Sequence, residues 1–157
     1  MTTMEDSIRK RTVLRAPLER VWSAITDSSQ FGRWFGSEFD GPFVAGEAVA
    51  GRMVPSEVDA EGTDEQQQYA GMRWTAHVVA IEPMSRFAFR WNADSESDAL
   101  TTVSFELEET ADGVALTITE SGFDALPADR RARTIESNTH GWDIQAGLLA
   151  AFLEQNP

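Results

Sequence analysis

The sequence predicts one α+β domain in which an antiparallel β-sheet packs against a long C-terminal helix. Segments 86–91, 100–108 and 114–118 carry apolar residues at every second position, which is typical of strands with one buried face. Residues 127–154 form the longest stretch with helical periodicity, and its apolar stripe has to pack against another element. The 157 residues, 41% of them hydrophobic, suffice for one core and contain no repeat or linker. We therefore expect residues 1–157 to form a single domain.

A strand and two short helices are expected near the N-terminus. Residues 8–14 predict a strand that contains β-branched side chains, and Pro17 suits the first turn of a helix. The apolar residues of that helix recur at helical spacing: Leu18, Val21, Trp22 and Ile25. Beyond the break at 27–29, a second short helix is predicted by Phe31, Trp34 and Phe35, and Gly36 can end it.

The central part of the chain predicts the remaining strands. Short strands are expected at Gly41–Val44 and Glu47–Val54, followed by a flexible acidic, glutamine-rich loop at about 55–69. The β-rich part that follows gives four further segments: Met72–Ile81, Arg86–Trp91, Leu100–Glu108 and the strand containing Val114, Leu116 and Ile118. Because short turns such as Asp112-Gly113 join them, an antiparallel meander of about six strands follows the two helices.

The long C-terminal helix is predicted to bury a mixed stripe. Its members share one side of a helical wheel: Arg131, Ile135, Asn138, Thr139, Trp142, Gln145, Ala146, Leu149 and Leu153. Gly141 and Gly147 interrupt this helix, and each lowers helix stability by about 0.8–1 kcal/mol relative to alanine. We expect a close approach of the sheet, or a local bend, to compensate.

Charge and composition exclude several classes of protein. The net charge of −13 argues against binding to nucleic acid or anionic membranes, and the chain has no cysteine and only two histidines. Because of this lack of metal-ligating residues, we expect no metal or cofactor. No apolar run approaches the ~20 residues of a membrane span, so we expect a soluble, cytoplasmic protein. Residues 92–129 contain no Lys or Arg. The acids there, including Asp94, Glu96 and Asp98, are expected to be solvated in preference to binding a cation.

Several segments resemble SRPBCC proteins of the heat-shock-protein-90 ATPase activator-like family. The similarity lies in residues 16–27 and 31–36, in Ile81-Glu82-Pro83 with residues 87–91, and in residues 119–123 and 140–142. It implies a helix-grip fold of the START or birch-pollen-allergen type, in which a curved sheet of about six to seven strands wraps the C-terminal helix and leaves a cavity. It implies no single activity, because such proteins include hydrophobic-ligand carriers, polyketide cyclases and a co-chaperone domain.

Ten residues are expected to line this cavity: Trp34, Phe35, Trp74, Phe89, Trp91, Phe105, Glu120, Asn138, Trp142 and Gln145. Trp34 and Phe35 are placed at its rim by similarity. Asn138, Thr139 and Gln145 either face the cavity or lie at the margin of the helical stripe. Glu120 is in phase with Ile118 and therefore points inward, where it could act as a general acid or base, although a structural role is favoured. Arg131 could meet an anionic ligand, but pairing with solvent is favoured.

The leading hypothesis is a protein that binds a small hydrophobic or aromatic molecule in this cavity and is not an enzyme. No catalytic residue is assigned. One alternative is a cyclase- or hydrolase-like enzyme that uses cavity groups such as Glu120 and Asn138. Another is a co-chaperone-like module that binds a protein partner. Self-association into a homodimer through a sheet edge also stays open.

Overall fold

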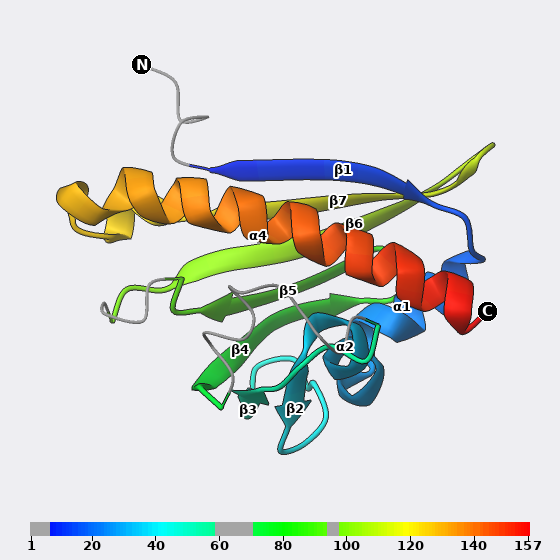
Figure 1. The fold of residues 1–157 in the computed structure, drawn as a ribbon, viewed down its shortest axis with the longest axis horizontal. Helices are drawn as coiled ribbons and strands as arrows, with labels where there is room; N and C mark the ends of the chain where they lie inside the picture. Colours follow the sequence, from blue (N-terminus) through cyan, green and yellow to red (C-terminus); the bar gives the residue numbers. More distant parts are fainter. Residues whose placement is uncertain (1–6, 59–70, 94–97) are drawn as a thin grey trace.

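The computed structural model describes residues 7–58, 71–93 and 98–157. Seven strands form one antiparallel sheet in the order β1-β7-β6-β5-β4-β3-β2, and the sheet curves around the long helix α4 (Figure 1). The elements in chain order are β1 Ile8–Leu14, α1 Leu18–Thr26, α2 Ser28–Phe35, β2 Ser37–Phe39, β3 Ala48–Met53, β4 Arg73–Glu82, β5 Arg86–Trp91, β6 Thr101–Thr110, β7 Gly113–Ser121, the 3-10 helix η2 Phe123–Ala125 and α4 Ala128–Gln155. The predicted fold class, with two short helices after the first strand, is confirmed.

Local signals in the sequence explain how helix α2 begins and ends. The Asp27 carboxylate accepts hydrogen bonds from the backbone N–H groups of Ser29 and Gln30, which caps the helix start. Gly36 ends the helix with φ +91°, a left-handed conformation that favours glycine. The chain turns there directly into β2, which pairs with β3.

The predicted strand at Gly41–Val44 is wrong, because the strand lies earlier, at Ser37–Phe39. The chain reverses at Gly36 and places Ser37 opposite Met53. Residues 37–39 therefore occupy the edge of β3, and residues 41–44 cannot pair with it. Residues 44–47 instead form a turn, in which the Glu47 N–H donates to the Val44 carbonyl at 3.0 Å.

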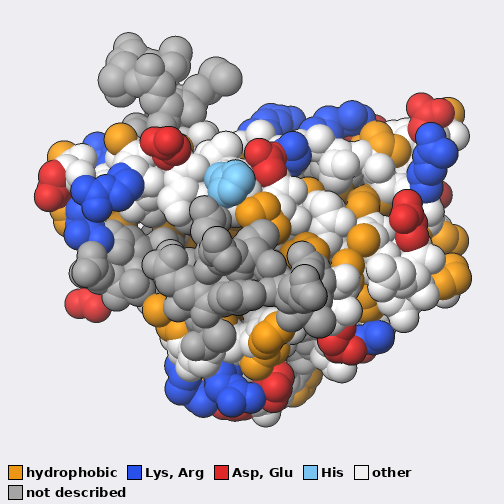
Figure 2. All heavy atoms as spheres, in the orientation of Figure 1, with side chains coloured by type: hydrophobic (Ala, Val, Ile, Leu, Met, Phe, Trp, Pro, Cys, Tyr) orange, Lys and Arg blue, Asp and Glu red, His pale blue; other side chains and the backbone are white. Residues whose placement is uncertain are grey.

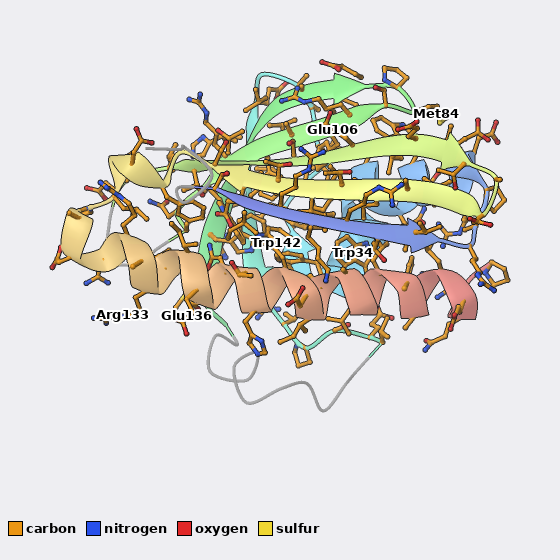
Figure 3. All side chains as sticks on the ribbon, turned by 90° about the horizontal axis from the view of Figure 1, so that it is seen from above. Trp34, Met84, Glu106, Arg133, Glu136 and Trp142 are labelled. Atoms are coloured by element: carbon orange, nitrogen blue, oxygen red, sulfur yellow. The ribbon has the colours of Figure 1, made fainter. Side chains whose placement is uncertain are left out.

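The alternation of the central strands is confirmed, with the apolar side chains on the face that packs against α4. Phe105 is paired with Phe87 of β5 and Ile118 of β7, and all three are fully or almost fully buried. Glu106, the next residue, is exposed and lies on the side of the sheet away from α4 (Figure 3). The sheet therefore separates an aromatic interior from a polar outer face.

Helix α4 lies along the concave face and buries Trp142, Leu149 and Phe152. Of the two positions left open for Thr139, the margin of the stripe is the one observed: its side chain is exposed, and its hydroxyl donates to the Ile135 carbonyl of the same helix at 2.7 Å. Of the two explanations offered for Gly141 and Gly147, a close approach of the sheet is excluded, since a Cβ added to either glycine would meet no atom within 4 Å.

The surface carries small groups of both charges. On the described part of the face shown in Figure 2, acidic and basic side chains are interspersed with hydrophobic ones. No helix among the described residues is long and apolar enough to cross a membrane. Most of the predicted acidic loop, residues 59–69, and also Asp94 and Glu96 lie outside the described residues.

Candidate ligand-binding site

Four aromatic rings from four elements meet between the sheet and α4. Phe35 of α2 lies 5.8 Å from the Trp74 ring of β4, 6.2 Å from Trp91 of β5 and 6.3 Å from Trp142 of α4, measured between ring centroids. Trp91 is also 5.4 Å from Trp74 and 5.7 Å from Trp142. Phe35 and Trp142 are buried, whereas Trp74 and Trp91 are partly exposed. We call these four residues the aromatic wall.

The three indole N–H groups of the aromatic wall are all bonded inside the protein. Trp74 Nε1 donates to Ser37 Oγ at 3.0 Å, and the indole nitrogens of Trp91 and Trp142 each donate to Glu120 at 2.8 Å. These bonds fix the orientation of the rings and leave their apolar faces for contact. Groups of the protein itself therefore fix the orientation of the three indoles.

Glu120 is the buried polar centre behind the wall. Its side chain is 0% exposed and accepts hydrogen bonds from four donors. Besides the two indoles, the Thr101 hydroxyl donates at 2.6 Å, and the Asn138 amide donates to both carboxylate oxygens at 3.1 and 3.2 Å. The inward orientation predicted for Glu120 is confirmed, but its partners are uncharged groups and not an arginine. Its four donors come from β5, β6 and α4.

Asn138 and Gln145 are both partly exposed on the inner side of α4, on either side of Trp142 in sequence. Gln145 Nε2 donates to the Phe35 carbonyl at 3.2 Å. Its Oε1 atom is buried and has no hydrogen-bond partner among the described residues. The two amides therefore differ: Asn138 supports Glu120, and Gln145 presents an unused acceptor beside the wall.

Trp34 and Phe35 lie deeper than the sequence predicts. Trp34 and Phe35, expected at the rim, are instead 1% and 3% exposed, and Trp34 Nε1 donates to the Ala24 carbonyl at 2.9 Å (Figure 3). The rim assignment failed because α2 packs its aromatic face into the core. Phe89 and Phe105 are likewise buried, 6.3 Å apart between ring centroids.

Arg131 and Thr101 acquire roles that the sequence analysis did not assign. The Arg131 guanidinium donates to three backbone carbonyls at the turn into α4: those of Phe123, Asp124 and Leu126. It therefore fixes that turn instead of facing a ligand. Thr101 is fully buried, and its alternation with Val103 and Phe105 would have identified it as an inward-facing residue.

A separate hollow of about 560 Å³ lies between α2, β2 and residues 54–57. Charged side chains line it, among them Arg33, which pairs with Glu57 at 3.2 Å. None of the ten predicted cavity residues lines this hollow, but Ser37 and Phe39 do. Both also contact Trp74, so the hollow adjoins the aromatic wall.

Comparisons with known proteins agree with this architecture. A family model described as Activator of Hsp90 ATPase homolog 1-like protein matches residues 15–154. None of the curated proteins compared with the chain matches it. Among solved structures, protein MLL2253 from Mesorhizobium loti is 20% identical with a TM-score of 0.72, over 96% of this chain and 98% of its own.

Two further structures show the same similarity. BPP1335 from Bordetella parapertussis is 25% identical with a TM-score of 0.69, over 97% of this chain and 77% of its own. DynU16, from the dynemicin biosynthetic locus, is 24% identical with a TM-score of 0.70 over 95% of this chain. The chain spans about half of DynU16, 47% of its length. These structures share the helix-grip fold.

Proposed function

The chain belongs to the family of Activator of Hsp90 ATPase homolog 1-like proteins, and from this premise we propose that it binds a small hydrophobic or aromatic molecule between its sheet and α4. The observation that carries the proposal is the aromatic wall, whose indole N–H groups are all satisfied within the protein. Rings held in this way lose little conformational entropy when a ligand covers them, which favours binding. Trp74 and Trp91 supply the accessible part of that surface.

The hydrogen bonds of Glu120 argue for a positioning role and against catalysis. An acid or base catalyst has to come within hydrogen-bond reach of the reacting atom. Glu120 is 0% exposed and already accepts bonds from Trp91, Thr101, Asn138 and Trp142. We therefore propose ligand binding in preference to cyclase- or hydrolase-like chemistry.

Titration with the fluorescent probe phenylnaphthylamine tests this function. The probe is neutral and aromatic, and its emission rises when it leaves water. We expect saturable binding to the intact chain and at least tenfold weaker binding to Trp74→Leu, which removes an accessible ring of the wall. Trp22→Leu is the matched control, because Trp22 is also partly buried but lies on α1 outside the wall. No saturable binding, or equal loss in both variants, would contradict the proposal.

A further inference from the structure

We propose that this site selects aromatic ligands that carry a hydrogen-bond donor and discriminates against anions. The inference rests on the proposed ligand-binding function and adds the chemical class of the ligand. Two independent observations support it. Among the residues that the structure describes, Gln145 presents a buried acceptor without a donor, and Glu120 places a formal negative charge behind the wall without a cationic partner.

The orientation of the Gln145 amide makes its oxygen the free group. Its Nε2 donates to the Phe35 carbonyl at 3.2 Å. Turning the amide over would bring two oxygens together at this distance, so the hydrogen-bond network determines the orientation. Oε1 is left buried, with no partner in the described parts of the chain. A buried acceptor of this kind is unfavourable unless a donor reaches it, and a ligand N–H or O–H group would supply one.

Phe35 connects this acceptor to the aromatic wall. Its carbonyl holds the Gln145 amide, while its ring contacts those of Trp74, Trp91 and Trp142. From these contacts we place a ligand that covers the accessible rings beside the Gln145 side chain. A flat aromatic molecule with a donor at its edge can use both features at once.

The charge around the wall disfavours an anion. The side chains that donate to Glu120 are neutral, so they stabilise the carboxylate without cancelling its charge. Two cations of β1 and α4 are engaged by other groups: Lys10 pairs with Asp143 at 2.6 Å, and Arg131 donates to the backbone carbonyls before α4. In a poorly solvated interior, the Glu120 carboxylate would repel an anionic ligand over a distance of several ångströms.

Matched probes on one ring system test the two parts of the inference. Anilinonaphthalene sulfonate carries a negative charge on the ring system of phenylnaphthylamine, and N-methyl phenylnaphthylamine lacks its N–H donor. We expect the neutral parent to bind at least tenfold more tightly than the sulfonate and about three- to tenfold more tightly than the methylated compound. Each dissociation constant is measured by fluorescence titration and checked by calorimetry.

Two variants assign these preferences to residues. Gln145→Met should abolish the preference for the N–H compound while leaving the discrimination against the sulfonate. Glu120→Gln should reduce the discrimination against the sulfonate at least threefold, whereas Glu136→Gln, on the exposed side of α4 (Figure 3), should not. Circular dichroism verifies that each variant is folded.

The outcomes separate this inference from the proposed function. If the parent probe does not bind, the proposed function fails, and the inference fails with it. If the parent binds but the sulfonate or the methylated compound binds equally well to the unaltered chain, the inference is overturned and the proposed function stands. This comparison needs no variant, so it remains decisive if Glu120→Gln does not fold.

Discussion

Replacing Glu120 by glutamine should destabilise the fold by about 2–4 kcal/mol. The two carboxylate oxygens accept from different indoles, Trp142 at one and Trp91 at the other, both at 2.8 Å. A glutamine has only one oxygen, so its amide nitrogen has to face one of the indole N–H groups. An unsatisfied buried donor costs about 1–3 kcal/mol, and replacing charge-assisted bonds by neutral ones costs about 1 kcal/mol more. Relief from burying a charge offsets part of this loss.

Urea denaturation followed by tryptophan fluorescence measures this change. In thermal unfolding, the same change corresponds to a fall in Tm of roughly 4–16 °C for a chain of this length. In a Trp142→Phe background, the loss of unfolding free energy caused by Glu120→Gln should be smaller by about 1–3 kcal/mol. The glutamine oxygen then has only the Trp91 indole N–H to accept from, and no indole donor is left unsatisfied. Glu136→Gln, which is exposed, should change stability by less than about 0.5 kcal/mol. A change below about 0.5 kcal/mol for Glu120→Gln, or an increase in stability, would refute the assigned network.

Three further substitutions should shift the urea midpoint in stated directions. Gly147→Ala should raise stability by about 0.8–1 kcal/mol, because this exposed helical glycine has open space around its Cβ position; a decrease would contradict this. Gly113→Ala should lower it by about 1–3 kcal/mol, because φ is +141° and the added Cβ would clash with the Leu14 carbonyl oxygen; a neutral result would refute that strain. Arg20→Met should cost about 1–2 kcal/mol, because it removes hydrogen bonds to the Asn156 carbonyl and to Gln30 Oε1 together with a cation 5.3 Å from the Phe152 ring centroid; no loss would show that these contacts add nothing.

Period-two alternation made most of the sheet predictable. Phe105 and Glu106 fall on opposite faces because successive strand residues must do so, and the same phase predicted that Glu120 points inward. The strand at Ser37–Phe39 was missed because it is only three residues long and depends on the reversal at Gly36. Short pairings of this kind are determined by tertiary context more than by local pattern.

The partners within the site could not be predicted from the sequence. Glu120 is held by side chains from three elements, and Thr101 and Asn138 lie 19 and 18 residues from it along the chain. Thr139 illustrates a second limit. The helical wheel places it on the side of Trp142, yet its side chain is exposed and its hydroxyl donates to the Ile135 carbonyl one turn earlier. Periodicity gives the side of an element and does not give the partner of a polar group.

The pairing of β1 with β7 affects how this chain folds as it is synthesised. Ile8 lies opposite Glu120, more than one hundred residues later, so a nascent chain holds β1 without its partner until β7 has emerged. At about 5–20 residues per second, that interval is roughly 5–20 s. An unpaired strand can associate with other chains, and charged side chains oppose such association. Arg9, Lys10 and Arg11 place three positive charges on β1, and such charges disfavour its pairing with another copy of the same strand.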